Sequence, residues 1–356
     1  MSQRATPPFR ADHVGSLLRT APLKEARAKR AKNEIDAAAL KAVEDREIEK
    51  IIKQQEDVGL KLATDGEFRR SWWHFDFFRQ LAGVTPITTT TGMQFRGVQT
   101  RHEAIRIDGK VDFVGHAHLE HFKFLKAHCR VTPKMTIPAP STFHFRQGRA
   151  MVSKEAYPDI DVFFADVGQT WRKAIRAFYD AGCRYLQLDD TAWAMMCDPK
   201  ERELSRQRGD DPDELPAIYA RVINAALAGK PADMAITMGS GGYEAVQEVL
   251  FNRIKVHGFF MEYDTERAGG FEPLHMLPKD RTAVLGLVTT KTGRLESKDE
   301  LKRRIEEAAK FVALDQLCLS PQCGFASTEE GNTLAEDEQW AKLRMIVELA
   351  DEVWGR

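Results

Sequence analysis

The sequence predicts an α/β protein with the fold of a (β/α)8 TIM barrel, and three observations support this prediction. Short apolar, β-rich runs alternate with amphipathic helical runs along the whole chain. This alternation is typical of a parallel sheet covered by helices. About eight such units can be counted, which favours closure into a barrel. An open doubly wound sheet is the alternative, but no G-x-G-x-x-G pattern follows the first strand.

The expected strands follow one another along the chain. They lie near residues 9–14, 60–68, 132–138, 184–190, 232–238, 257–264, 282–290 and 316–321. The helical runs between them carry apolar residues close to a 3.6-residue period, from Leu40, Val43 and Ile48 onward. Ser297, followed three residues later by Glu300, has the spacing of a capping box. We therefore expect one TIM-barrel domain over residues 1–356.

Residues 82–115 interrupt this alternation. The segment contains a run of threonines and then IRIDGKVDF, in which Asp108-Gly109 is a type I′ hairpin signal. We interpret it as a β-ribbon inserted after the second strand, which would serve as a lid or an oligomer contact.

Composition excludes several classes of protein. Fifty-two Lys and Arg residues balance 53 Asp and Glu residues, so the formal net charge is −1. This balance argues against a nucleic-acid or anionic-membrane surface. No apolar run reaches the roughly 18 residues of a membrane span, and the N-terminus lacks a signal-peptide core. Five cysteines at irregular spacing fit a reducing cytoplasm. A homo-oligomer remains open.

Polar residues gather where the expected strands end, which is the edge that carries the active site in such barrels. Carboxylates that converge there repel one another unless a cationic group or a metal neutralises them. The alternative for any single acid is that it caps the following helix. The candidates are Asp12, His13, Gly15, Ser16, Asp65, Glu67, Asp189, Asp190, Glu262, Asp264 and Cys323.

Cys323 follows the last strand and precedes Gly324. Zinc favours thiolate ligands, and Glu262 could supply an oxygen ligand. A buried, inert cysteine is the alternative, and Cys318 is expected in the core. For His116, His118 and His121, a solvated helix face is favoured over a metal cluster. Trp72 and Trp73 are expected either to line a pocket or to pack under the ribbon, and Lys291 is expected on the surface.

Six segments resemble the compact relatives of cobalamin-independent methionine synthase, a group that also includes epoxyalkane–coenzyme M transferase. They are HVGSLLR, LATDGEFRRSWW, LQLDD, FFMEYD, GLVTTKTG and LSPQCGFASTEEGN. The resemblance covers nearly the whole chain, and the last segment is the most specific. It implies a zinc-dependent barrel, equivalent to the catalytic C-terminal half of the full-length synthase, that transfers an alkyl group to a thiol.

The resemblance also implies residue roles. Gly15 and Ser16 match the turn that holds an amino-acid carboxylate, and Glu67 and Asp189 match the acids that hold its ammonium group. Glu262 and Cys323 match two zinc ligands. The family's other two ligands form a His-x-Cys pair at the end of strand five, whereas this chain has neither His nor Cys between Thr237 and Tyr243.

The expected function is therefore zinc-dependent methyl transfer to homocysteine, giving methionine, with 5-methyltetrahydrofolate or a related donor. Two alternatives stay open. One is alkyl transfer to another thiol, such as coenzyme M, which has no ammonium group for Glu67 and Asp189. The other is a non-catalytic amino-acid-binding barrel that has lost its zinc ligands.

Overall fold

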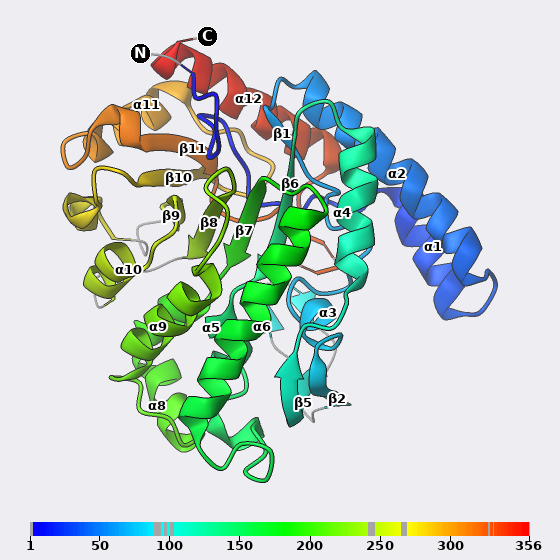
Figure 1. Ribbon diagram of the computed structural model, residues 1–356. Coiled ribbons are helices and arrows are strands. Elements are labelled where there is room, and N and C mark those ends of the chain that lie inside the picture. Colours follow the sequence, from blue (N-terminus) through cyan, green and yellow to red (C-terminus); the bar gives the residue numbers. More distant parts are fainter. Residues whose placement is uncertain are drawn as a thin grey trace.

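The structure is a computed structural model that describes residues 3–88, 94–95, 98–99, 103–240, 246–264, 269–326, 328–329 and 331–355. Within these residues, seven parallel strands form one curled sheet (Figure 1). Their order across the sheet is their order in the sequence. They are β1 (Leu62–Ala63), β6 (Thr132–Pro138), β7 (Tyr185–Asp189), β8 (Ala235–Ser240), β9 (Gly258–Glu262), β10 (Thr282–Val288) and β11 (Leu317–Pro321).

The parallel register brings the carboxyl ends of the strands to one edge. Asp189 pairs with Pro138 on one side and with Gly239 on the other. Gly286 likewise pairs with Glu262 of β9 and Ser320 of β11. Candidate residues that are far apart in the sequence are therefore placed at the same edge.

The expected first strand, at residues 9–14, is represented by a single parallel bridge between Ala11 and Leu319. Backbone hydrogen bonds join Asp12 N to Leu319 O at 3.0 Å and Leu319 N to Arg10 O at 2.8 Å. The N-terminal segment thus lies beside β11, at one end of the sheet. Seven of the expected strands are found, and closure into an eight-stranded barrel stays a prediction.

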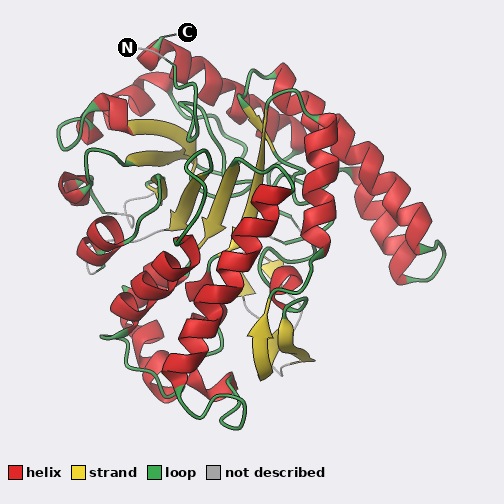
Figure 2. Cartoon of the chain, in the orientation of Figure 1, coloured by secondary structure: helices red, strands yellow, loops and turns green. Residues whose placement is uncertain are grey.

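Helices lie against the outer face of the sheet, as Figure 2 shows. The buried side of α6 is apolar because Phe163, Val167, Trp171 and Phe178 recur at helical spacing. The side chain of Asp36 caps α2 by accepting from Ala39 N at 2.7 Å. The longer helices are α1 (Ala21–Ala31), α2 (Ala37–Asp57), α4 (Ala117–His128), α6 (Ile160–Asp180), α8 (Pro199–Gln207), α9 (Leu215–Leu227), α11 (Lys298–Ala308) and α12 (Glu336–Trp354).

Shorter helical segments fill the connections. They are α3 (Phe75–Phe78), α5 (Pro140–Phe145), η1 (Arg149–Met151), α7 (Ala192–Met196), α10 (Gln247–Arg253), η3 (Glu272–Met276) and η4 (Leu314–Gln316). The capping box expected at Ser297 is not formed, because this side chain makes no capping hydrogen bond to α11. The two ends of the described chain meet where Gln3 Nε2 donates to Gly355 O at 2.6 Å (Figure 1).

Two further strand pairs lie outside the main sheet. Strand β2 (Ala82–Thr88) pairs antiparallel with β5 (Glu103–Asp112), and β3 (Gln94–Phe95) pairs with β4 (Val98–Gln99). The hairpin predicted at Asp108-Gly109 is wrong, because both residues lie inside β5. The ladder includes the pair Thr88–Glu103, and residues 89–93, 96–97 and 100–102 between them lie outside the described chain. Whether this segment is a lid or an oligomer contact stays a prediction.

The prediction of a solvated histidine face is also wrong for part of α4. His116 and His118 are buried, and the His116 ring stacks on Phe77 with centroids 4.4 Å apart. His116 Nε2 also lies 3.0 Å from Phe77 O. These rings pack against α3, and burial lowers the pKa of His116 to about 4, so it is neutral near pH 7.

A buried ion pair joins the N-terminal segment to β6. Lys134 Nζ is 3.0 Å from Asp12 Oδ1, and neither side chain is exposed. Lys134 also donates to His13 O at 2.5 Å, and Tyr185 Oη donates to Asp12 Oδ2 at 2.9 Å. Asp12 therefore has a structural role as the partner of Lys134. The sequence alone did not distinguish this role from a role in the active site.

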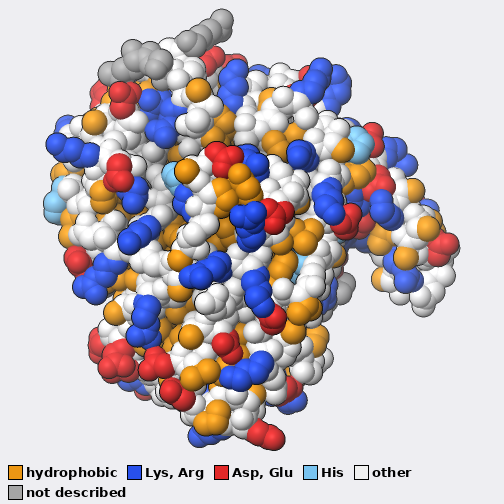
Figure 3. Space-filling model, viewed as in Figure 1, with side chains coloured by type: hydrophobic (Ala, Val, Ile, Leu, Met, Phe, Trp, Pro, Cys, Tyr) orange, Lys and Arg blue, Asp and Glu red, His pale blue; other side chains and the backbone are white. Residues whose placement is uncertain are grey.

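The surface matches the balanced composition. On the face shown in Figure 3, Lys and Arg side chains are interspersed with Asp and Glu side chains. Among the described residues, no helix combines the length and apolar character needed to cross a membrane.

Candidate active site

Glu67 lies in the loop after β1 with an unusual backbone conformation. Its φ of +61° is in the left-handed region, which non-glycine residues seldom adopt. Its amide donates to Asp65 Oδ1 at 2.9 Å, so Asp65 stabilises the turn. The side chain is buried, and within the described residues Oε2 has no hydrogen-bond partner. An orphaned buried carboxylate oxygen is costly, and a ligand donor would satisfy it.

Burial raises the pKa of Glu67, while the positive charges of Arg70 and Arg19 oppose this rise. Arg70 Nη2 is 3.5 Å from Glu67 Oε1, and both side chains are buried. The sequence interpretation missed Arg70. The signal was a charged residue three positions after Glu67, but the same spacing is common on exposed surfaces.

Asp189 ends β7 and faces the same region. Burial, and next the nearby carboxyl group of Glu67, raises the pKa of Asp189 to about 7. Gln187 Nε2 donates to Asp189 Oδ1 at 2.7 Å. The structure thus brings together the two acids to which the sequence assigned an ammonium group. Arg70 already lies beside Glu67 Oε1, whereas Glu67 Oε2 has no hydrogen-bond partner among the described residues and could accept from a ligand ammonium group.

The Gly15–Ser16 turn lies beside the carboxyl group of Glu67. A Cβ at Gly15 would lie 2.7 Å from Thr136 Oγ1 and 3.2 Å from Glu67 Oε1, so a side chain at this position would clash with Thr136 and crowd Glu67. Thr64 Oγ1 donates to Gly15 O at 2.6 Å, which ties the turn to the end of β1.

Ser16 is in contact with the segment that follows Cys323. Ser16 O accepts from Phe325 N at 3.0 Å, and Ser16 Oγ lies 3.4 Å from Ala326 N. A Cβ at Gly324 would lie 2.0 Å from Ser16 Oγ, so the absence of a side chain at Gly324 leaves the space that the serine hydroxyl occupies. The turn after the first expected strand is therefore in direct contact with the segment after the last one.

Glu262 and Cys323 belong to the ends of β9 and β11, on either side of β10. At Gly286 of β10 an added Cβ would lie 2.7 Å from Gln322 Cα and 2.9 Å from Met261 O. The missing side chain lets the two flanking segments approach each other. Burial raises the pKa of Glu262 to about 7, whereas the positive charge of Lys291 opposes this shift.

A closed zinc site needs about four ligands in a tetrahedral arrangement. Within the described chain, no group of three or more His, Cys, Asp or Glu side chains is placed to hold a metal. Residues 241–245, which follow β8, lie outside the description, and their sequence contains neither His nor Cys. The donor set thus does not fit the four-ligand site that the resemblance implies.

Other polar candidates have structural partners. Asp190 accepts from Thr142 Oγ1 at 3.0 Å, from Ala192 N at 2.8 Å and from Trp193 Nε1 at 2.9 Å. Lys291 is half exposed and lies 3.2 Å from Asp264 Oδ2. Trp72 and Trp73 are buried, and Trp73 stacks on His74. Asp190 therefore anchors the β7–α7 connection.

Comparison with known proteins places this arrangement in a family. A model of the cobalamin-independent synthase catalytic domain matches residues 9–352. The chain belongs to this family. Membership makes it an enzyme of the methyltransferase class and agrees with the resemblance drawn from the six segments.

Relatives of the cobalamin-independent synthase family differ in their distance from this chain. The uncharacterized Bacillus subtilis proteins YxjH and YxjG are each 50% identical, over 98% and 99% of the chain and 95% and 96% of their own lengths. A 5-methyltetrahydropteroyltriglutamate–homocysteine methyltransferase from Bacillus velezensis is 21% identical over 90% of the chain and 40% of that enzyme.

Solved structures support the same fold. A candidate vitamin-B12-independent methionine synthase from Listeria monocytogenes is 42% identical, with a TM-score of 0.83 over 99% of this chain and 100% of that one. A B12-independent methionine synthase from Shewanella sp. W3-18-1 has a TM-score of 0.73 at 16% identity, over 97% of each chain.

The alignment with YxjG also reveals a difference in length. It spans 367 positions, whereas this chain has 356 residues. The difference between 367 and 356 means that at least 11 aligned positions of YxjG have no counterpart here. This chain therefore lacks internal residues that a relative with half its sequence in common possesses.

Proposed function

We propose that the chain methylates the thiol of homocysteine to give methionine, with 5-methyltetrahydrofolate or a related methylated pterin as donor. The observation that carries this proposal is the pairing of the buried carboxyl group of Glu67 with the half-buried one of Asp189 beside the Gly15–Ser16 turn. The ammonium group of an amino acid would lie between the two acids. Its carboxylate would accept hydrogen bonds from the turn and from the Ser16 hydroxyl.

In the proposed reaction, the sulfur of homocysteine attacks the methyl carbon in line with the bond to the donor nitrogen. One S–C bond forms, one N–C bond breaks, and the thiol proton ends on the departing nitrogen, so no further reactant is needed. The residues of this chain contribute by holding the amino-acid part, which fixes the sulfur relative to the donor. Exclusion of water from this region strengthens the interaction of the ammonium group with both carboxylates.

Zinc, when bound in this family, lowers the pKa of the thiol that it coordinates. Glu262 and Cys323 are the proposed ligands that remain in this chain. We infer that the positions missing relative to YxjG include the connection after β8, where the His-x-Cys pair is expected. Two ligands would hold zinc weakly, so no step above depends on it.

The test is a turnover assay with homocysteine and methylated folates as donors, in which methionine is the expected product. The control acceptor is 4-mercaptobutyrate, which has the same thiol and carboxylate but no ammonium group. We expect homocysteine to be preferred at least tenfold. Equal use of the two thiols would contradict the role of Glu67 and Asp189 and favour a thiol of the coenzyme M kind.

One observation favours a second candidate, an amino-acid-binding barrel without catalysis. It is the incomplete donor set around Glu262 and Cys323, which would leave the thiol poorly activated. This candidate predicts homocysteine binding with no methionine formed from any donor, even with added zinc. Calorimetric binding measured on the same preparation as the turnover assay separates the two functions. The proposed cytoplasmic location suits either one.

A further inference from the structure

We propose that Arg19 is a positioning residue that fixes the Glu67 carboxyl group relative to the Gly15–Ser16 turn. The inference rests on the proposed function, because it concerns the binding of the substrate ammonium group. Arg19 is 1% exposed and lies in the connection between the turn and α1. Its position three residues after Ser16 places it close to the turn in sequence.

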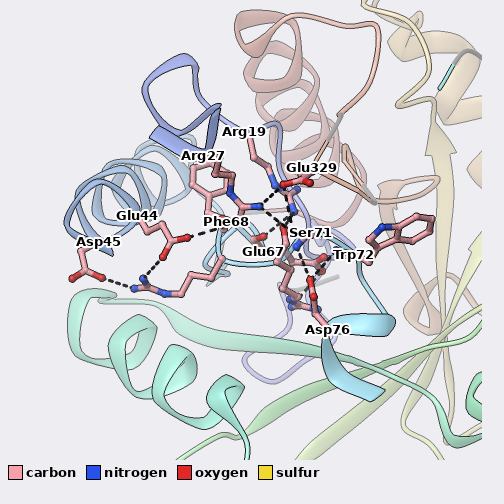
Figure 4. A network of polar contacts seen from close by, with 12 residues as sticks. Arg19, Arg27, Glu44, Asp45, Glu67, Phe68, Ser71, Trp72, Asp76 and Glu329 are labelled. Atoms are coloured by element: carbon pink, nitrogen blue, oxygen red, sulfur yellow. Dashed lines mark hydrogen bonds and ion pairs between the residues drawn. The ribbon is translucent and has the colours of Figure 1, made fainter. Parts of the chain in front are cut away.

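The guanidinium group joins three segments of the site. Nη1 donates to Ala326 O at 2.9 Å and to Leu17 O at 3.2 Å. Nη2 donates to Glu67 O at 2.8 Å and to Arg70 O at 3.1 Å. One side chain thus holds the backbone of the Glu67 loop and the segment after Cys323 against its own connection. Figure 4 shows Arg19 directed toward the Glu67–Trp72 loop and the segment that carries Glu329.

The Glu67 loop needs such a support because its conformation is unfavourable. A non-glycine residue in the left-handed region is strained, and this conformation persists where neighbouring groups fix it. The Glu67 carbonyl accepts from Arg19 Nη2 and from Arg70 N at 3.0 Å. Arg19 holds the peptide plane that follows the Glu67 Cα, and the hydrogen bond from Glu67 N to Asp65 holds the plane that precedes it, so the two contacts together fix the direction of the Glu67 Cα–Cβ bond.

The geometry requires arginine and not merely a positive charge. A guanidinium group presents five N–H donors in a rigid plane, whereas a lysine ammonium group is a compact charge on a flexible stem. Lysine at position 19 would keep the charge near Glu67 but could not hold all four carbonyls in the same plane. Burial lowers the pKa of Arg19 to about 10, so the group remains charged at neutral pH.

Arg27 provides a matched control in the same network. It donates to Phe68 O at 2.6 Å and pairs with Glu329 at 2.7 Å, so it also ties the loop to the C-terminal segment. Its hydrogen bonds do not include the carbonyls of Glu67 and Ala326 among those described. A variant of Arg27 therefore removes contacts that only stabilise the loop, whereas a variant of Arg19 removes the contacts that we propose orient Glu67.

The experiment measures dissociation constants of homocysteine and 4-mercaptobutyrate for wild type, Arg19→Lys and Arg27→Lys by calorimetry. Only homocysteine carries the ammonium group that Glu67 would contact. We expect Arg19→Lys to weaken homocysteine at least tenfold and 4-mercaptobutyrate less than twofold. Arg27→Lys should change neither affinity more than twofold. If Arg19→Lys does not fold, Arg19→Gln replaces it, because an amide avoids burying an unpaired ammonium group.

The outcomes separate the two levels of the proposal. If wild type binds homocysteine no better than 4-mercaptobutyrate, the proposed function fails and the role of Arg19 falls with it. If wild type prefers homocysteine but the Arg19 variant keeps both affinities, or loses both in equal proportion, the positioning role alone is wrong. A loss confined to homocysteine in the Arg19 variant, with none in Arg27→Lys, supports it.

Discussion

The half-buried carboxyl group of Asp189 lies near the buried one of Glu67, and this raises the pKa of Asp189 into the neutral range. Burial is the largest cause, and the charge of Glu67 is the next. Because the pKa of Asp189 is raised to about 7, the protein without ligand retains a proton on this carboxyl group below that pH. An ammonium ligand favours the ionised carboxylate and would displace this proton.

The affinity for homocysteine should increase with pH up to about 7 and then level off. The ammonium group prefers the ionised form of Asp189, whose pKa is about 7 without ligand. Below this value each pH unit should cost up to about tenfold in affinity, since one pKa unit corresponds to about 1.4 kcal/mol. Calorimetry between pH 5 and 8.5 tests this, with Asp189→Asn as the variant that should bind weakly and lose the dependence. An unchanged slope in Asp189→Asn would contradict the assignment.

The same shift predicts how Asp189→Asn changes stability. An acid whose pKa is higher in the folded than in the unfolded state stabilises the fold below its unfolded pKa, near 4, and this contribution is lost as the pH rises toward 7. Without ligand, Asp189→Asn should therefore gain stability relative to wild type between pH 4 and 7, by on the order of 2–4 kcal/mol. Urea unfolding at several pH values measures the difference. A difference independent of pH would mean that Asp189 is ionised throughout.

Breaking the interior ion pair should be costly. Lys134→Met leaves the carboxyl group of Asp12 buried without its charged partner, and we expect a loss of about 3–5 kcal/mol in the free energy of unfolding. The control is Lys173→Met, which removes an ion pair with Asp112 in which both side chains are over a third exposed. An exposed pair is worth about 1 kcal/mol or less. Similar losses in the two variants would show that Lys134 is not a stabilising partner.

The metal assignment predicts different effects for two cysteines. If Cys323 is a zinc ligand, Cys323→Ser should abolish zinc uptake and leave the fold intact, because serine is a poor zinc ligand at neutral pH. Cys318→Ser is the control, since Cys318 is buried and burial raises the pKa of its thiol to about 12. Equilibrium dialysis against a fixed concentration of free zinc measures the bound metal, because the weak binding expected for wild type would not survive dialysis against metal-free buffer. Full zinc content in Cys323→Ser would make Cys323 a packing residue.

Local patterns were enough to predict much of this protein. The alternation of apolar and amphipathic runs predicted seven strands of the parallel sheet, because the spacing of apolar residues within a short segment distinguishes a strand from a helix. The polar strand ends led to Glu67 and Asp189, since parallel strands place their carboxyl ends at one edge. The family resemblance was carried by short segments such as LATDGEFRRSWW and LSPQCGFAS.

Only the tertiary structure decided which partners these residues have. Lys134 lies in an apolar run and meets Asp12 across 122 positions, and Arg19 reaches Ala326 across 307. His116 is buried because α3 packs on it, although its own sequence segment is polar. Asp108-Gly109 has the composition of a turn, yet both residues lie inside β5, between Ile107 and Asp112, which pair with β2. Local sequence determines periodicity and backbone preference, whereas burial and charge partners depend on contacts between segments far apart in the chain, which exist only once the sheet has folded.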